Sequence, residues 1–122
     1  MDNDDFRALL TTYLEPTGDP NPQMLNVRIE WIRGDDRLGS DHIRIKHGVS
    51  EQEVEEVLLE IPPFVEAKRS SEHPNRTLFW GATRNDRELL VVCEDKVEGD
   101  LRVLTPITAF EPDDGIEYWE RL

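Results

Sequence analysis

The sequence has a single cysteine, and its 122 residues include only 14 lysines and arginines against 27 aspartates and glutamates. One thiol excludes a disulfide within the chain, and one cysteine with three scattered histidines does not match the ligand spacing of a zinc site. Cys93 lies in the apolar run 89–93, which predicts a buried structural thiol rather than an exposed nucleophile. We therefore expect no metal and no other cofactor.

Long apolar segments are also missing. No run approaches the roughly 20 residues that a membrane-spanning helix needs. The first five residues include three aspartates, unlike a signal peptide. We expect a cytoplasmic protein that makes no contact with membranes. The length of 122 residues predicts one domain with a modest core.

Positive charge is scarce relative to negative charge, and the net charge is −13. A charge of this sign repels the phosphate backbone of nucleic acids at long range and favours a basic partner. Two stretches contain no lysine or arginine, 51–66 and 111–120. The first is either a solvated helix face or a docking patch for a cationic protein. The cations concentrate instead in 28–46 and 68–102.

The first two dozen residues predict an appendage to the domain. Apolar residues recur at helical spacing over residues 6–14, and Pro16 and Gly18 end this helix. The residues that follow are rich in proline and read as a linker. We therefore divide the chain into an N-terminal helix with its linker, 1–24, and a domain, 25–122.

The next part of the sequence predicts one strand and one irregular helix. Residues 25–31 alternate between apolar and polar side chains, as in a half-buried strand. Residues 35–47 predict a helical stretch that Gly39 interrupts and that Gly48 caps at its C-terminus.

The helix that follows Ser50 has the strongest local signals. Ser50 and Glu53 have the spacing of a capping box, and Val49 and Val54 occupy the positions of a hydrophobic staple. An apolar stripe continues from there to a pair of prolines that stops the helix: Val54, Val57, Leu58 and Ile61, then Pro62 and Pro63.

The rest of the chain predicts four strands and a last helix. The strands are expected at 64–68, 77–83, 88–94 and 100–105, with a tight hairpin at Asn85 and Asp86, and Pro106 is expected to end the pairing. The helix is expected over 111–121, with Ile116 and Trp119 facing inward. Short connections favour antiparallel pairing. The predicted fold is α+β, a twisted and mainly antiparallel sheet packed with helices.

Several local strings follow one another in a distinctive order. They are Glu30-Trp31, Lys46-His47-Gly48-Val49-Ser50, Arg76 with Gly81, Arg87-Glu88-Leu89-Leu90-Val91-Val92, Leu101-Arg102-Val103, and Tyr118. Over residues 27–120 this order resembles the BrnT toxins, members of the RelE/ParE-like superfamily of toxin–antitoxin systems. The Lys-His-Gly-Val-Ser turn is the most specific of these features.

The resemblance implies a metal-independent ribonuclease that a basic antitoxin holds silent. Such enzymes cut RNA by attack of a ribose 2′-hydroxyl on the adjacent phosphate, which needs a base for the hydroxyl and cations for the phosphoryl oxygens. The candidate catalytic residues are Lys46, His47, Arg76 and Arg102, and the candidate substrate-binding residues are Arg87 and its neighbour Arg84.

Two departures from the family leave a non-enzymatic alternative open. The family usually carries an arginine soon after the last strand, whereas residues 105–108 of this chain contain no cation. The family is also less acidic. The alternative is an acidic interaction module, or a decoy that mimics nucleic acid, and both would bind a basic partner.

Each basic residue also has a purely structural interpretation. Lys46 and His47 suit the C-terminal end of a helix, whose partial charge is negative. Arg84 and Arg87 flank a hairpin and are expected in solvent. Arg102 alternates with apolar neighbours, so we expect it to point away from the core and to pair with a cross-strand acid. Catalysis requires the candidate residues to converge on one face, whereas the alternative predicts that they are dispersed or neutralised by carboxylates.

Overall fold

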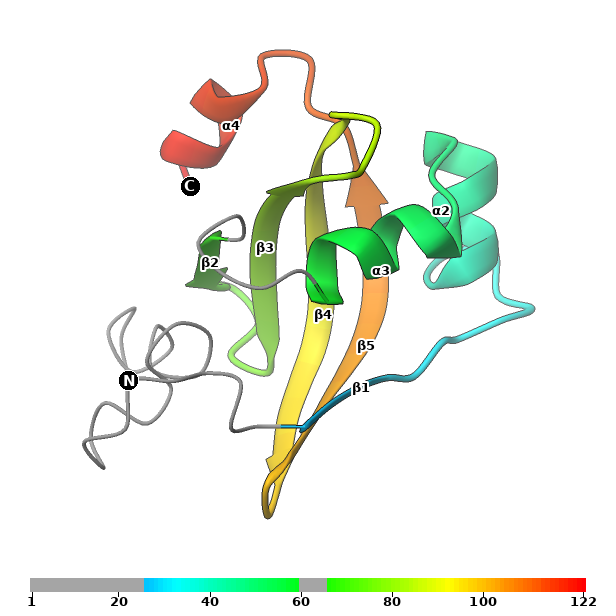
Figure 1. Ribbon diagram of the computed structural model, residues 1–122, viewed down its shortest axis with the longest axis vertical. Helices are drawn as coiled ribbons and strands as arrows, with labels where there is room; N and C mark the ends of the chain where they lie inside the picture. Colours follow the sequence, from blue (N-terminus) through cyan, green and yellow to red (C-terminus); the bar gives the residue numbers. More distant parts are fainter. Residues whose placement is uncertain (1–25, 60–65) are drawn as a thin grey trace.

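The computed structural model describes residues 26–59 and 66–122 (Figure 1). Five strands form one sheet in the order β1-β5-β4-β3-β2. The strands are β1 (Asn26–Ile29), β2 (Glu66–Arg69), β3 (Arg76–Ala82), β4 (Glu88–Glu98) and β5 (Leu101–Phe110). β1 runs parallel to β5, and the other neighbours are antiparallel. The predicted α+β class with a mainly antiparallel sheet is confirmed.

Three helices accompany the sheet in the described part of the chain: α2 (Ser40–His47), α3 (Glu51–Leu59) and α4 (Ile116–Glu120). In Figure 1, α3 crosses in front of the sheet and α2 lies beside β5. The predicted order of elements after residue 25 is confirmed. The helix expected over 6–14 and the stop at Pro62 and Pro63 lie outside the described residues. Within the described residues, no helix is long and apolar enough to cross a membrane.

The predicted start of α3 is confirmed in detail. The Glu53 backbone N–H donates to Ser50 Oγ at 3.1 Å, and the Ser50 backbone N–H donates to Glu53 Oε1 at 3.0 Å. These two bonds are the reciprocal pair of a capping box, and they satisfy two donors that the helix start would otherwise leave unpaired. Val49 and Val54 are both buried in the same core cluster, as the staple requires.

α2 is shorter than the sequence predicts. It begins at Ser40 rather than near residue 35 because Gly39 has φ +87° and passes close to Ile32. A Cβ on Gly39 would lie 2.5 Å from the Ile32 carbonyl oxygen, so no other residue fits there without movement. Gly48 ends the helix in the left-handed conformation at φ +66°, as predicted.

β5 continues past Pro106, and the prediction that this proline ends the pairing is wrong. The ladder pairs Cys93 with Pro106 and then Val92 with Thr108, so the register shifts by one residue there. This bulge accommodates the donor that proline lacks. β1 pairs with β5 only as far as Leu104, so Pro106 lies beyond that ladder.

The sheet has an apolar core on each face. The larger core lies under α2 and α3 and contains Cys93, which is fully buried as predicted, and burial raises the pKa of its thiol. The smaller core joins Trp80, Leu90 and Trp119 on the other face. The Trp80 and Trp119 rings stack with their centroids 6.2 Å apart.

α4 is shorter than the predicted helix over 111–121. Gly115, with φ +57°, stands at its N-terminal boundary, and a turn occupies the residues before it. Trp119 faces inward as predicted, with 2% of its surface exposed. Ile116 was expected to face inward too, but 40% of its surface is exposed. α4 is only five residues long, so it buries a single large side chain.

Candidate functional site

α2 brings two histidines together beside β5, His42 near its start and His47 at its C-terminal end. The His42 and His47 rings meet edge to face with their centroids 5.2 Å apart. His42 Nε2 lies 3.3 Å from Thr108 Oγ1, and the His47 ring lies 5.6 Å from the Phe110 ring. Lys46, between them in sequence, is exposed. Two of the candidate catalytic residues, Lys46 and His47, therefore lie where β5 ends.

The surroundings of His47 keep its imidazole neutral. Burial lowers the pKa of His47, and the charges of His42 and Lys46 lower it further. A neutral imidazole can accept a proton near pH 7, so His47 has the property that a general base needs. No local spacing in the sequence indicates His42 as the neighbour of His47. Residues five positions apart fall outside the i+3 and i+4 spacing of one helix face, and Thr108 is distant in sequence.

Arg87 lies next to this histidine pair, but its guanidinium is neutralised. Its Nη1 donates to both carboxylate oxygens of Glu53, at 3.0 and 2.9 Å, and to the Gly48 carbonyl at 3.1 Å. Its Nε donates to Glu111 Oε1 at 3.0 Å. These hydrogen bonds to Glu53 and Glu111 raise the pKa of Arg87. The side chain is 28% exposed, so the expectation of a solvated Arg87 is wrong.

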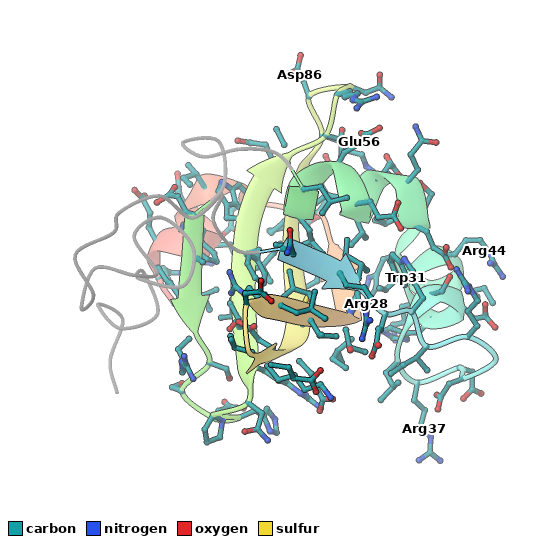
Figure 2. All side chains as sticks on the ribbon, turned by 60° about the horizontal axis from the view of Figure 1, so that its bottom comes forward. Arg28, Trp31, Arg37, Arg44, Glu56 and Asp86 are labelled. Atoms are coloured by element: carbon teal, nitrogen blue, oxygen red, sulfur yellow. The ribbon has the colours of Figure 1, made fainter. Side chains whose placement is uncertain are left out.

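Arg84 is exposed at the β3–β4 hairpin, as expected for a solvated residue. The hairpin turns at Asp86, which has φ +62°, and its backbone N–H donates to the Thr83 carbonyl at 2.9 Å. The Arg84 backbone N–H donates to Glu56 Oε1 at 3.0 Å, which ties the hairpin to α3. Figure 2 shows Glu56 just below the hairpin that carries Asp86. The contact that positions Arg84 is thus a backbone one.

Arg102 is buried, and the expectation that it points away from the core is wrong. Its Nε donates to Asp95 Oδ1 at 3.0 Å and its Nη2 to Asp95 Oδ2 at 2.6 Å. The side chains of Arg102 and Asp95 are 2% and 4% exposed. The expected cross-strand acid is therefore present, and Thr77 Oγ1 also donates to it at 2.8 Å. Alternation misled the prediction because Val103, on the opposite face, is buried as well.

Arg76 and Arg102 lie far from the histidine pair and on opposite faces of the sheet. Arg76 precedes Thr77 on β3, and the Thr77 hydroxyl reaches Asp95 on the helix-covered face, so Arg76 faces the other way. Arg102 and Phe110 are eight residues apart on β5, which is about 26 Å at roughly 3.3 Å per residue. The candidate catalytic residues therefore do not converge on one face.

The glutamates of α3 are occupied by neighbouring segments of the chain. Glu51 accepts from Arg33 Nη2 at 2.8 Å, and Glu55 accepts from the Trp31 indole N–H at 2.9 Å. Glu53 and Glu56 hold Arg87 and the Arg84 backbone, as described above. These four glutamates are thus not simply solvated, because they fasten the loop after β1 and the β3–β4 hairpin to the helix.

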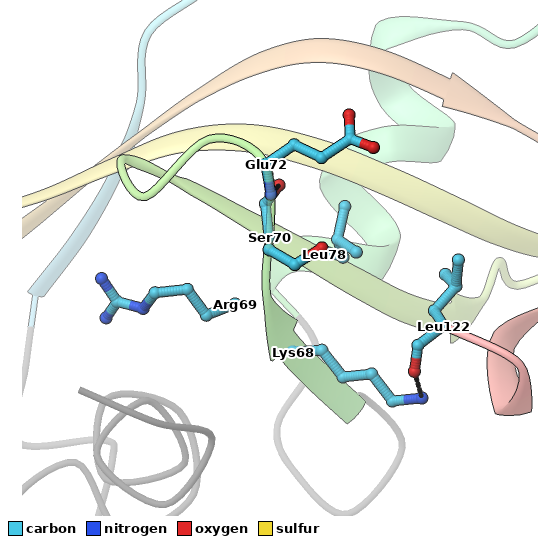
Figure 3. Close-up of a pocket in the computed structure, with 7 residues that line it drawn as sticks. Lys68, Arg69, Ser70, Glu72, Leu78 and Leu122 are labelled. Atoms are coloured by element: carbon cyan, nitrogen blue, oxygen red, sulfur yellow. Dashed lines mark hydrogen bonds between the residues drawn. The ribbon is translucent and has the colours of Figure 1, made fainter.

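A cavity of about 400 Å³ lies between the start of the β2–β3 connection and the end of the chain. It is lined by Lys68, Arg69, Ser70, Ser71, Glu72, Leu78 and Leu122 (Figure 3). Lys68 Nζ donates to the Trp119 carbonyl at 2.7 Å and to the Leu122 carbonyl oxygen at 3.2 Å, and it lies 4.6 Å from the centre of the Trp119 ring. The Lys68 charge therefore stabilises the end of α4.

Comparison with other proteins adds no assignment, because no family model and no curated protein matches the chain. Within 26–59 and 66–122, no group of three or more histidine, cysteine, aspartate or glutamate side chains could hold a metal ion.

Proposed function

We propose that this chain is a non-enzymatic interaction module, built on a scaffold like that of the BrnT and RelE/ParE-like toxins, which binds a cationic protein partner. One observation carries the proposal. Of the four candidate arginines, Arg87 and Arg102 are each bound by carboxylates of the same chain, and Arg76 and Arg102 lie on opposite faces of the sheet. A carboxylate bound to a guanidinium already matches its charge, which weakens its attraction for a phosphate.

The charge balance supports a cationic partner. The chain carries 27 acidic residues against 14 lysines and arginines, and the α3 carboxylates are used internally. Exposed carboxylates remain elsewhere, including Glu94 on β4 and Glu117 and Glu120 on α4. Exposed charges of one sign attract a partner of the other sign and speed its association. A basic antitoxin has the required chemistry.

Binding measurements test the proposal. The full-length protein is titrated with a lysine-rich helical peptide and, separately, with single-stranded RNA, each at low and at high salt. A peptide of the same length with glutamate in place of lysine is the control. We expect the lysine peptide to bind more tightly than RNA, with an affinity that falls as salt rises. Tighter binding to RNA, or peptide affinity indifferent to salt, would contradict the proposal.

A second candidate function is RNA cleavage, which the resemblance to the BrnT toxins implies and the histidine pair favours. In this reaction His47 would take the proton of the ribose 2′-hydroxyl as its oxygen attacks phosphorus. His42 would face the departing 5′-oxygen, and Lys46 would face the phosphoryl oxygens. The two ring centroids, 5.2 Å apart, are close enough for both to reach one phosphate.

The second candidate has its own test. Wild type, His42→Gln and His47→Gln are incubated with RNA and with translating ribosomes. Cleavage by wild type that both variants lose would establish the histidine site. Cleavage that persists in both variants would place the reaction elsewhere. No cleavage by wild type under any condition would exclude the enzyme hypothesis and leave the interaction module as the function.

A further inference from the structure

α2 meets the end of β5 through two imidazole rings. The His42 and His47 rings touch each other edge to face with their centroids 5.2 Å apart. His42 Nε2 lies 3.3 Å from Thr108 Oγ1, and the His47 ring packs 5.6 Å from the Phe110 ring. Both histidines are only partly exposed. We call these four side chains the histidine contact.

The histidine contact lies where three elements of the fold meet. α2 supplies the two histidines and β5 supplies the other two side chains. The Phe110 ring in turn meets Tyr118 of α4 edge to face at 5.8 Å. β1 pairs with β5 only as far as Leu104, so α2 takes the place of a neighbouring strand beyond that point. A backbone hydrogen bond from the Gly39 N–H to the Ile107 carbonyl at 2.8 Å and the ring contacts hold α2 there.

Protonation changes the character of this contact. A neutral imidazole has one N–H donor and one acceptor nitrogen, whereas a protonated one has two donors and a positive charge. The separation of 5.2 Å between the rings is shorter than the Debye length, which is about 8 Å at physiological salt, so dissolved ions screen two such charges poorly. The second proton is therefore harder to add than the first for as long as the rings stay together.

The other charges of α2 leave this repulsion in place. Burial, His42 and Lys46 all lower the pKa of His47. Asp41 precedes His42, but its carboxylate accepts a backbone hydrogen bond and lies 3.7 Å from the Arg44 guanidinium. The negative end of a helix favours a protonated histidine, but the last carbonyls of α2 already accept backbone N–H groups of the cap.

The elements packed around α2 do not offset the repulsion either. Glu53 of α3 and Glu111, which follows β5, both bind the Arg87 guanidinium. The two β5 side chains of the histidine contact carry no charge, and Tyr118 of α4 faces the Phe110 ring. These groups therefore give the pair little compensation for a second proton.

We infer that the histidine contact is a pH-sensitive switch, which holds α2 against β5 while its imidazoles are neutral and opens when the second proton binds. Acid favours the open form because separated rings bind two protons more readily than rings in contact. The opening frees the last turn of α2 and, through Phe110, reaches Tyr118 on α4. Ile43 stays buried in the larger core and keeps α2 attached. The switch operates in the chain itself and needs neither a partner nor a substrate.

Imidazole titration tests the coupling between the rings. The side-chain signals of the three histidines are followed by NMR in the full-length protein from pH 8 to pH 5. We expect His42→Gln to move the midpoint of the His47 signals to higher pH, because a neighbouring charge is removed. His73→Gln, at an exposed position of the β2–β3 connection, is the control and should leave that midpoint unchanged. The same His47 midpoint in His42→Gln and wild type would overturn the coupling.

Hydrogen exchange tests the opening. The Gly48 and Val49 amides donate to carbonyls of α2 at 3.0 and 3.3 Å. Their protection factors, which correct for the intrinsic pH dependence of exchange, should fall about tenfold between pH 7.5 and pH 5. The Val54 amide, which donates to the Ser50 carbonyl at the start of α3, is the internal control and should keep its protection.

Variants separate a local switch from general destabilisation. His42→Gln cannot carry the second charge, so its Gly48 and Val49 amides should stay protected at pH 5. His47→Gln makes the same test if His42→Gln does not fold. Equal loss of protection at Gly48 and Val54 would show that acid weakens the whole domain, and would overturn the switch. Wild-type protection that is the same at both pH values would overturn it as well.

Discussion

Two stretches of this chain have the same sequence character and different surroundings. α3 and residues 111–120 are both rich in acidic residues and free of lysine and arginine. In α3, four glutamates each accept a hydrogen bond from a distant segment, including Arg33 and Arg87. In residues 111–120, Glu111 binds Arg87 and Asp114 binds Arg121, whereas Glu117 and Glu120 are exposed outside the ion pairs of the described residues.

The difference shows that a local charge pattern does not determine how the charge is used. The donors that occupy α3 come from the loop after β1 and from the β3–β4 hairpin, which the fold brings beside this helix. α4 lies at the end of the sheet, where fewer donors reach it. The α3 carboxylates therefore stabilise the fold, and the exposed carboxylates of α4 are the ones that the proposed function assigns to a partner.

The largest effect is expected at the most buried carboxylate partner. Arg102→Ala would leave Asp95 buried and without its cation, and breaking a buried ion pair in this way costs about 3–5 kcal/mol. Arg76→Ala, at a partly exposed position of β3, should cost less than about 1 kcal/mol. Urea unfolding of the two variants measures both free energies. Equal losses of unfolding free energy would mean that breaking the Arg102–Asp95 pair costs no more than removing a partly exposed arginine.

A smaller effect is expected on α3. Glu53→Ala removes the partner of the Ser50 backbone N–H and one of the two carboxylates at Arg87, so we expect a loss of about 1–3 kcal/mol. The matched change on the other acidic stretch, Glu117→Ala, should stay within about 0.5 kcal/mol. Thermal melts compare the two. A comparable loss of stability in Glu117→Ala would show that the two acidic stretches contribute alike to the fold.

Local signals in the sequence predicted most of the fold. The start of α3, the cap at Gly48 and the hairpin at Asp86 follow from contacts between residues a few positions apart, and the structure confirms each. Pro106 and Ile116 were misjudged because their environments depend on distant partners. The bulge beside Pro106 arises in its pairing with Val92 and Cys93 of β4, and the exposure of Ile116 follows from how little α4 covers.

The candidate site was less predictable for the same reason. The bonds that neutralise Arg87 and Arg102 link residues on different strands and helices, and no local spacing encodes them. Arg102 follows the alternation of an exposed position, yet both faces of β5 are covered at that point. His42 becomes a candidate site residue only through its contacts with His47 and Thr108.

The Ser50 hydroxyl that caps α3 should contribute a moderate amount of stability. Ser50→Ala removes the acceptor of the Glu53 backbone N–H, so we expect a loss of about 1 kcal/mol. Ser71→Ala, at an exposed position in the β2–β3 connection, is the control and should have little effect. Wild-type stability in Ser50→Ala would show that α3 does not depend on this cap.

The smallest effect is expected from pH. The folded state lowers the pKa of His47 below 6.5, so the unfolded chain binds more protons below that value. The contribution of His47 is complete above about pH 6.5 and is lost as the pH falls through its folded pKa. Glu51, whose pKa the hydrogen bond from Arg33 lowers from 4.5, loses its contribution only at lower pH. Unfolding at several pH values should show a mild decline below about pH 6.5 that His47→Gln reduces. An unchanged decline in that variant would exclude His47 as its source.

The most direct test of the account neutralises the two acidic stretches separately and measures binding of a lysine-rich helical peptide. Glu117→Gln with Glu120→Gln should lower the peptide affinity several-fold and leave the melting temperature unchanged. Glu51→Gln with Glu55→Gln should lower the melting temperature and leave the affinity of the folded protein unchanged, because those carboxylates already bind Arg33 and Trp31. The reverse result, with affinity lost on α3 and stability lost at α4, would contradict the account.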